Sequence, residues 1–183
     1  MNSAESDKSM TRKIACCSLL ALFLQDARAT CMNVENTSVP LSTPTSSFTV
    51  SGDGTVLAPQ TKLMWMRCLL GQTLTGGLCT GTAATFTWSD ALNAAKTQTF
   101  AGYNDWRLPN VKELLSILED RCWTPALNAD LFPIPQLFAA WSSTPAANLA
   151  NEFIDAWVVD GNGYVSSMSP VDTLNVLLVR DAP

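Results

Sequence analysis

The pattern of apolar and polar positions divides the chain into two groups of short strands with helical segments between them. In the first part, short apolar or alternating runs flank the turn Gly52-Asp53-Gly54, which is typical of a hairpin. In the last third, Gly161-Asn162-Gly163 separates two further alternating runs and predicts a second hairpin. The expected strands are residues 48–50, 55–57, 63–66, 141–144, 153–159, 164–168 and 174–180.

Two segments between these strand groups repeat apolar residues at the spacing of one helix face. The first begins after Thr87, and the second begins after Asn110 and is expected to end near Asp120. The stretch 123–138 contains three prolines and predicts a long loop of the kind that often carries function. Helices grouped between an early and a late set of strands predict an α+β fold with an antiparallel sheet.

The first 29 residues show the three-part pattern of a secretory signal peptide. Three basic residues precede the apolar run 14–24, and the small-residue site Ala27-Arg28-Ala29 follows it. This run is shorter than the roughly 20 residues that a membrane-spanning helix needs. We therefore expect residues 1–29 to be cleaved, in preference to forming a buried N-terminal helix. The mature chain is then predicted to lack a transmembrane segment and to be exported to the periplasm, the cell surface or the medium.

Composition separates the remaining chain into a leader and one domain. Residues 30–47 are rich in Ser, Thr and Pro and predict a linker or surface strap, whereas residues 48–183 suit a single domain. The net charge is −5, and loss of residues 1–29 removes four of the 11 basic residues but only three of the 16 acidic ones. An acidic chain without a basic cluster argues against nucleic-acid binding. The oligomeric state stays open.

Four cysteines follow residue 29, and an even number suits an exported, disulfide-bonded domain. They are Cys31, Cys68, Cys79 and Cys122, which allow three pairings. Cys68 and Cys79 flank a glycine-containing stretch that can fold back on itself, which favours a bridge between them and leaves Cys31 to pair with Cys122. A zinc site would normally show close C-x-x-C pairs, and the chain after residue 29 has none.

The residue inventory argues against catalysis. The sequence contains no histidine, which removes the commonest general base and the usual partner of a serine or cysteine nucleophile. The turn around Asp53 lacks the further oxygen ligands of a calcium-binding loop. We therefore expect a protein that is not an enzyme and that uses no cofactor and no metal.

A long ordered motif runs from Phe100 to Asn110 with the sequence FAGYNDWRLPN. With it go Gly54-Thr55-Val56 and the segments at 63–67, 88–92, 112–114, 141–144 and 179–180. Together these residues resemble the C-terminal domain of Legionella collagen-like adhesins over residues 48–181. The resemblance implies a fold similar to C-type lectins and formylglycine-generating enzymes, with two helices flanking a twisted antiparallel sheet that carries long loops. The family usually has glycine where this chain has Lys62.

The resemblance also bears on the ligand and on the motif. In the adhesin this domain is associated with sulfated glycosaminoglycans, polyanions that an acidic chain is poorly charged to attract. The late cysteine pair of formylglycine-generating enzymes has no counterpart after Cys122. Within the motif, Trp106 is expected to fill the junction between the helices, and Arg107 is expected to bond to carbonyls or to a nearby carboxylate such as Asp105.

The candidate ligand-binding loops are residues 123–138, 145–151 and 160–164. Trp65, Trp88, Trp106, Trp141 and Trp157 lie in patterned segments and are expected in the core, so Trp123 is the remaining candidate for stacking on a sugar. The resulting hypothesis is an exported, adhesin-like recognition module for a glycan or a cell-surface protein. The alternative is a structural or assembly component of the bacterial cell envelope, tethered by the leader. The candidate ligand-binding residues are Trp123, Asn148, Asp160, Asn162 and Tyr164.

Overall fold

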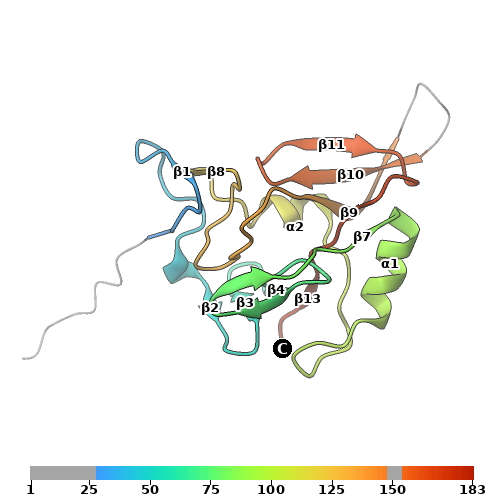
Figure 1. Cartoon of the computed structure of the whole chain (residues 1–183), viewed down its shortest axis with the longest axis horizontal. Helices are drawn as coiled ribbons and strands as arrows, with labels where there is room; N and C mark the ends of the chain where they lie inside the picture. Colours follow the sequence, from blue (N-terminus) through green and yellow to red (C-terminus); the bar gives the residue numbers. More distant parts are fainter. Residues whose placement is uncertain (1–27, 148–153) are drawn as a thin grey trace, which may run out of the picture.

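The computed structural model describes residues 28–147 and 154–183, and it is a mixed α+β fold made mostly of sheets (Figure 1). The predicted signal peptide therefore lies almost entirely outside the described residues. The two helices are α1 (Trp88–Thr97) and α2 (Val111–Leu115), with a 3-10 turn at Thr45–Ser47. The strands are β1 (Val34–Glu35), β2 (Thr49–Val50), β3 (Thr55–Ala58), β4 (Leu63–Met66), β5 (Thr73–Thr75), β6 (Leu78–Thr80), β7 (Thr85–Phe86), β8 (Cys122–Trp123), β9 (Ala139–Ala147), β10 (Ile154–Asp160), β11 (Val165–Met168), β12 (Leu174–Asn175) and β13 (Val179–Asp181).

Two larger sheets form the body of the molecule. One has the order β11-β10-β9-β12-β7 and the other the order β13-β4-β3-β2. Two small two-stranded sheets complete the described strands: the hairpin of β5 and β6, and the pairing of β1 with the distant β8. All pairings are antiparallel except the short contact between β12 and β9. The expected antiparallel α+β arrangement is confirmed apart from that contact.

Both helices begin where the sequence predicts. Thr87 caps α1 by accepting a hydrogen bond from the backbone N–H of Asp90 at 3.3 Å. Asn110 and Glu113 form a reciprocal capping box at the start of α2. However, α2 ends at Leu115, well before the expected end near Asp120. Beyond the helix, the N–H groups of Ile117 and Leu118 bond to carbonyls three residues back, and that of Glu119 bonds to the carbonyl of Ala126 at 3.1 Å, so the α-helical hydrogen-bond pattern does not continue.

The predicted strand at residues 174–180 is wrong as a single element. It is divided into β12 and β13, which belong to different sheets, while residues 176–178 lie buried between them. Leu177 and Val179 pack in one hydrophobic cluster with Trp65 and Phe132, whereas the other cluster, around Trp141, takes the alternate residues Val176 and Leu178. This segment therefore joins the two sheets through two hydrophobic cores.

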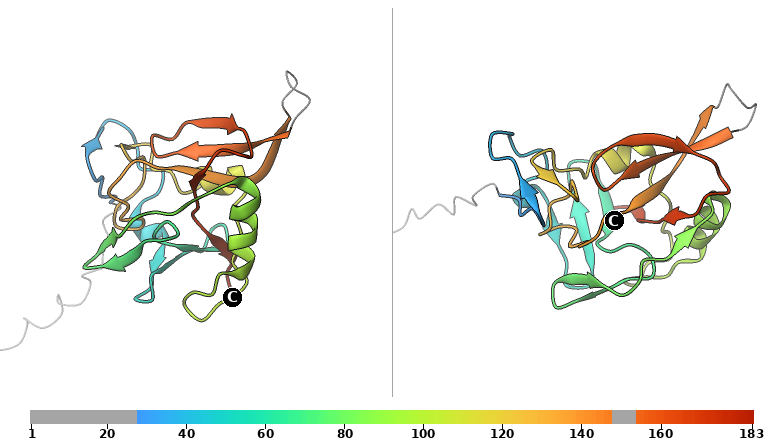
Figure 2. Two further views of the ribbon diagram at one scale, coloured as in Figure 1. Left: turned by 45° about the vertical axis from the view of Figure 1, so that its right-hand side comes forward. Right: turned by 45° about the horizontal axis from the view of Figure 1, so that its top comes forward.

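The leader, residues 30–47, lies against the domain as a surface strap. In Figures 1 and 2 it occupies the side of the molecule opposite α1. The disulfide Cys31–Cys122 attaches its start, and buried Thr43 bonds through both N–H and hydroxyl to the Glu119 carboxylate. The second bridge joins Cys68 to Cys79, so the predicted cysteine pairing is confirmed. Within the described residues, no helix is long and apolar enough to cross a membrane.

Candidate functional site

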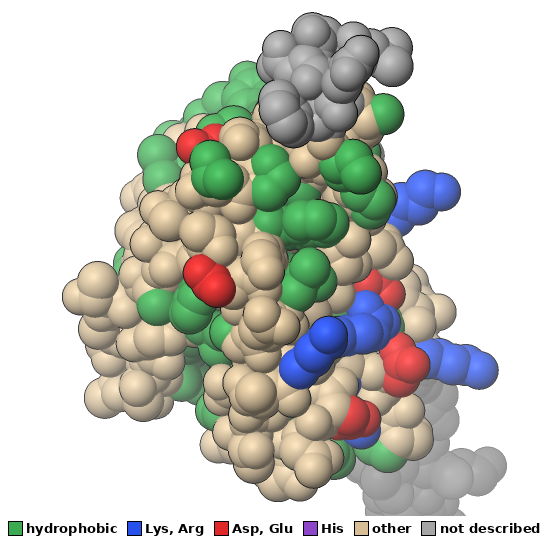
Figure 3. Space-filling model, turned by 90° about the vertical axis from the view of Figure 1, so that its right-hand side faces the viewer, with side chains coloured by type: hydrophobic (Ala, Val, Ile, Leu, Met, Phe, Trp, Pro, Cys, Tyr) green, Lys and Arg blue, Asp and Glu red, His purple; other side chains and the backbone are tan. Residues whose placement is uncertain are grey.

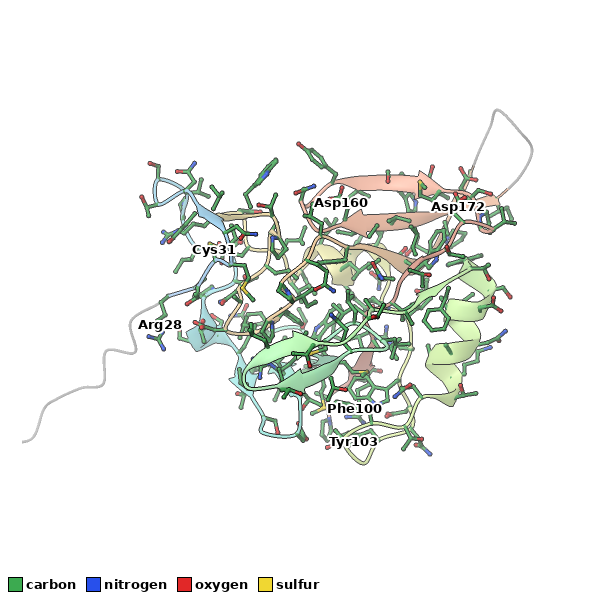
Figure 4. The ribbon with its side chains drawn as sticks, viewed as in Figure 1. Arg28, Cys31, Phe100, Tyr103, Asp160 and Asp172 are labelled. Carbon is green, nitrogen blue, oxygen red and sulfur yellow. A yellow bond between two sulfur atoms is a disulfide. The ribbon has the colours of Figure 1, made fainter. Side chains whose placement is uncertain are left out.

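Four of the five predicted ligand-binding residues lie close together, and the fifth, Asn148, lies outside the described residues. Trp123 ends β8, whereas Asp160, Asn162 and Tyr164 belong to the turn between β10 and β11. The Asp160 label in Figure 4 marks this turn. The sequence placed Trp123 on one predicted loop and the other three residues on another. The fold brings the two loops to one edge of the molecule.

Of the loop predicted at residues 145–151, residues 145–147 do not join this group, and residues 148–151 lie outside the described residues. Residues 145–147 belong to β9, which is longer than the sequence predicted. Ala147 pairs with Ile154, whereas Asp160 pairs with Ala139 at the other end of β10. Since a strand rises about 3.3 Å per residue, the length of β10 puts these two ends roughly 20 Å apart.

Asp160 shapes the turn that presents Tyr164. Its Oδ1 accepts hydrogen bonds from the backbone N–H groups of Asn162 at 2.8 Å and Tyr164 at 3.0 Å. The backbone N–H of Asp160 also donates to the Tyr164 carbonyl at 3.0 Å. This oxygen of Asp160 is therefore engaged in local structure, and we assign the residue a positioning role. Beside it, Oδ1 of Asn162 is buried without a hydrogen-bond partner.

Leader residues contact the backbone on both sides of Trp123 and hold it in place. Val34 of β1 pairs with Trp123, and Glu35 pairs with Cys122, whose sulfur bonds to that of Cys31. In addition, the Asn33 side-chain amide donates to the carbonyl of Thr124. Trp123 is therefore anchored by its neighbours, although its own side chain faces solvent.

Trp123 and Tyr164 form an exposed aromatic pair. Their ring centroids lie 6.0 Å apart with an interplanar angle of 89°, an edge-to-face contact. Trp123 is 48% exposed, Tyr164 is 61% exposed and neighbouring Val34 is 57% exposed. We call these three side chains the aromatic platform. Large apolar side chains that stay in water next to one another are typical of a contact surface.

The other tryptophans behave as predicted with one exception. Trp65, Trp106 and Trp141 are buried, and half-buried Trp88 packs on the core while its Nε1 donates to the Ser142 carbonyl at 2.8 Å. Trp157 is wrong as a core residue, because it is 36% exposed. Its neighbours Ala156 and Val158 point inward, so the alternation of the strand turns Trp157 outward.

The motif at residues 100–110 has a structural role in this chain. The ring nitrogen of Trp106 donates to the Phe100 carbonyl at 3.2 Å, and Arg107 forms a bidentate pair with Glu113 at 2.8 and 2.9 Å. As expected, Arg107 bonds to a carbonyl, that of Leu108 at 3.5 Å, and to carboxylates, but these belong to Glu113 and Asp181 and not to Asp105. Asp105 pairs instead with Arg180, at 2.7 and 2.9 Å, because β13 brings Arg180 alongside it.

These ion pairs leave mixed charge on this side of the molecule. Hydrogen bonds with Glu113 and, to a smaller extent, with Asp181 raise the pKa of Arg107. The hydrogen bond from Arg180 lowers the pKa of the Asp105 carboxyl group. Figure 3 shows the basic and acidic side chains of this face lying next to one another, with hydrophobic side chains gathered above them. Within the part of the chain that the structure describes, no group of three or more His, Cys, Asp or Glu residues is arranged to hold a metal ion.

Sequence reasoning missed the way in which the leader supports the platform. Glu119 is completely buried and binds Ser42 and Thr43, so a carboxylate holds the strap that contains β1. A Ser-Thr pair and a distant Glu have no spacing that would link them in the sequence. Val34 likewise could not be predicted as part of a binding surface, because in the sequence it is a single apolar residue near a cysteine.

A family model described as the Lcl C-terminal domain matches residues 54–180. This range begins in the turn between β2 and β3 and ends within β13, so it spans the five-stranded sheet, the four-stranded sheet except β2, and both helices. No curated protein matches the chain.

Proposed function

The chain belongs to the Lcl C-terminal domain family, and we propose that it is an exported recognition module that binds a glycan through the aromatic platform. The family membership and the two disulfides are consistent with an extracellular module. The signal-like residues 1–29 support export, with residues 30–183 as the mature chain. Within the mature chain, residues 30–47 act as a docked strap on the domain that follows.

The exposed pair of Trp123 and Tyr164 is the observation that carries the proposal. Two large aromatic side chains remain in water although the same domain buries three tryptophans. Burying such rings is favourable, so leaving them exposed is costly unless they meet a partner. Their edge-to-face contact, the Asp160 turn and the Cys31–Cys122 bridge all restrict their movement. A restricted platform loses little conformational entropy when a ligand binds.

The charge distribution favours an uncharged ligand. The net charge of the chain is −5, and Asp160 is the charged residue within the turn that carries Tyr164. Aromatic faces contact the C–H groups of a sugar ring without needing an ionic partner. A neutral glycan therefore suits the platform better than a sulfated polyanion.

The fold and the residue inventory support the same class of function. We propose that the architecture, with two helices beside antiparallel sheets and long connecting loops, is C-type-lectin-like. We also propose that the protein is not an enzyme, because the whole sequence lacks histidine. Detectable turnover of any substrate by the purified protein would overturn this second point.

A glycan array tests the proposal. The purified protein is applied with and without calcium, together with the variants Trp123→Ala and Tyr164→Ala. Trp157→Ala is the matched control, because it removes a partly exposed tryptophan that is not part of the platform. We expect reproducible binding that both platform variants abolish and that the control retains.

Two other results contradict the proposal. Binding that is unchanged in both platform variants would place the glycan site elsewhere on the chain. A blank array, combined with cell-envelope proteins that co-purify equally with the wild-type protein and the platform variants, would favour an assembly role.

A further inference from the structure

A cavity of about 420 Å³ lies in a different part of the molecule from the aromatic platform. Three segments line it: the turn between β2 and β3, the chain that follows β4, and the residues after α1. Figure 4 shows its lining residue Phe100 at the lower edge of the view and Asp160 of the platform turn at the upper edge. The volume lies within the roughly 300–1,000 Å³ range of small-molecule sites.

The walls of this cavity are closely packed. A Cβ atom added at Gly54 would lie only 2.9 Å from Cζ of the Phe100 ring, so that ring rests directly on the glycine backbone. A Cβ atom at Gly71 would lie 2.7 Å from the Thr82 carbonyl oxygen. The Cys68–Cys79 bridge fixes the segment between these walls. The cavity is therefore part of a tightly packed region and is not a gap between loosely placed loops.

One polar atom in the lining lacks a partner. Oε1 of Gln72 is buried and accepts no hydrogen bond, although Gln72 lines the cavity. Leaving a buried acceptor unsatisfied costs about 1–3 kcal/mol, and such groups in folded proteins need an explanation. Rotation of the terminal amide towards the cavity would let a ligand hydroxyl group donate to this oxygen.

The remaining lining indicates the chemistry of the ligand. Gln98 adds a second amide, which can both donate and accept, and Asp53 adds a carboxylate at the rim. Burial alone would raise the pKa of Asp53, but hydrogen bonds from Thr55 and Ser51 outweigh it and lower that pKa, so the group is ionised at neutral pH. Among the residues that the structure describes, no lysine or arginine lines the cavity, so anions are disfavoured.

Apolar side chains complete the site. Met66, Leu74 and Phe100 also line the cavity and offer apolar surface for the C–H groups of a ligand. We propose that this cavity is a second binding site, which takes one uncharged, hydroxyl-bearing ring of monosaccharide size. The ring places hydroxyl groups against Gln72, Gln98 and Asp53 and a C–H face against Phe100. This site does not depend on the aromatic platform.

Protein-observed NMR tests this site with glucose, galactose and N-acetylglucosamine as probes. Glucuronate serves as the anionic comparison. We expect at least one neutral probe at millimolar concentration to shift the side-chain amide signals of Gln72 and Gln98, and glucuronate to bind at least fivefold more weakly. Gln72→Leu should weaken binding at least tenfold, whereas Gln60→Leu, which changes an exposed glutamine outside the cavity, should not.

The controls separate this site from the platform and from misfolding. Gln72→Leu removes an unsatisfied buried acceptor, so we expect it to fold and to melt no lower than the wild-type protein. If it fails to fold, Gln98→Leu provides the same comparison. Trp123→Ala should bind the neutral probe as the wild-type protein does. The proposal is overturned if no neutral probe shifts these amides, or if the shifts persist unchanged in the glutamine variants of the cavity.

Discussion

Replacing Glu119 should loosen the attachment of leader residues Ser42 and Thr43 to the domain. This carboxylate is completely buried, and its Oε1 accepts from the N–H and hydroxyl of Ser42 at 3.1 and 3.3 Å and from the N–H of Arg121 at 3.1 Å. Its Oε2 accepts from the N–H and hydroxyl of Thr43 at 2.8 and 3.1 Å. Glu119 therefore supplies the acceptor for three backbone N–H groups at once.

The expected loss of stability follows from those three groups. Each buried N–H group left without an acceptor costs about 1–3 kcal/mol, and water that enters the space recovers part of the loss. We expect Glu119→Ala to lower the free energy of unfolding by about 3–5 kcal/mol. Glu119→Gln keeps one carbonyl oxygen but turns an amide N–H towards other donors, so we expect a loss of about 2–3 kcal/mol.

Urea denaturation with both disulfides intact measures these losses. Glu35→Gln is the matched control, because Glu35 forms a partly exposed ion pair with Arg121 at 3.5 Å, and its loss should cost no more than about 0.5 kcal/mol. Hydrogen exchange at Ser42 and Thr43 should accelerate in the Glu119 variants. A Glu119→Gln protein as stable as the Glu35→Gln protein would refute the reasoning.

The same carboxylate gives the stability a defined dependence on pH. Burial alone would raise the pKa of Glu119, but the hydrogen bonds from Thr43, Ser42 and Arg121 lower it below its ordinary value of 4.5. Between the lowered native pKa and 4.5, the unfolded chain binds more protons, so stability rises with pH in that interval. The contribution is complete above pH 4.5 and is lost as the pH falls through the native pKa. The gap between the wild-type protein and Glu119→Gln should therefore shrink below pH 4.5.

Three further changes have expected outcomes. Replacing Cys31 and Cys122 by serine removes a bridge with a sequence separation of 91, and the chain-entropy model gives a loss in the free energy of unfolding of roughly 4.5 kcal/mol. Removing the Cys68–Cys79 bridge, with a separation of 11, should cost roughly 3 kcal/mol. Equal losses of stability in chemical denaturation would contradict this ranking. Lys62→Gly relieves a left-handed φ of 56° and should change the free energy of unfolding by about 0 to +1 kcal/mol, whereas a lower melting temperature would contradict the strain. Arg107→Lys loses a bidentate pair that is partly screened by solvent and should cost about 1 kcal/mol, with a smaller loss at high salt; a loss independent of salt would point to packing instead.

Local patterns predicted most elements of the fold because each signal acts over few residues. The hairpin turns, the helix caps and the spacing of Cys68 and Cys79 all report on short-range geometry. Lys62 illustrates a local requirement, since its left-handed backbone is one that glycine adopts more readily. The prediction for residues 174–180 was wrong because a continuous apolar run predicts one buried strand. The sequence does not indicate that the two ends of this run pair in different sheets.

The candidate site was predictable only in part. Loop position and a lack of core patterning selected Trp123, and the second hairpin turn selected Asp160 and Tyr164. Their meeting was not predictable, because it depends on the β1–β8 pairing and on the length of β10. Trp157 was misassigned because an alternating strand fixes which residues share a face but not which face is buried.

Affinity for the strongest neutral glycan found on the array tests the recognition proposal most directly. The dissociation constant is measured by titration for the wild-type protein, Trp123→Ala and the control Trp157→Ala. Trp123 is 48% exposed, so its removal should leave the fold intact, as judged by an unchanged melting curve. We predict at least a tenfold loss of affinity in Trp123→Ala, equivalent to about 1.4 kcal/mol, with the control within twofold of the wild-type protein. Equal affinity in all three proteins would contradict a ligand site at the aromatic platform.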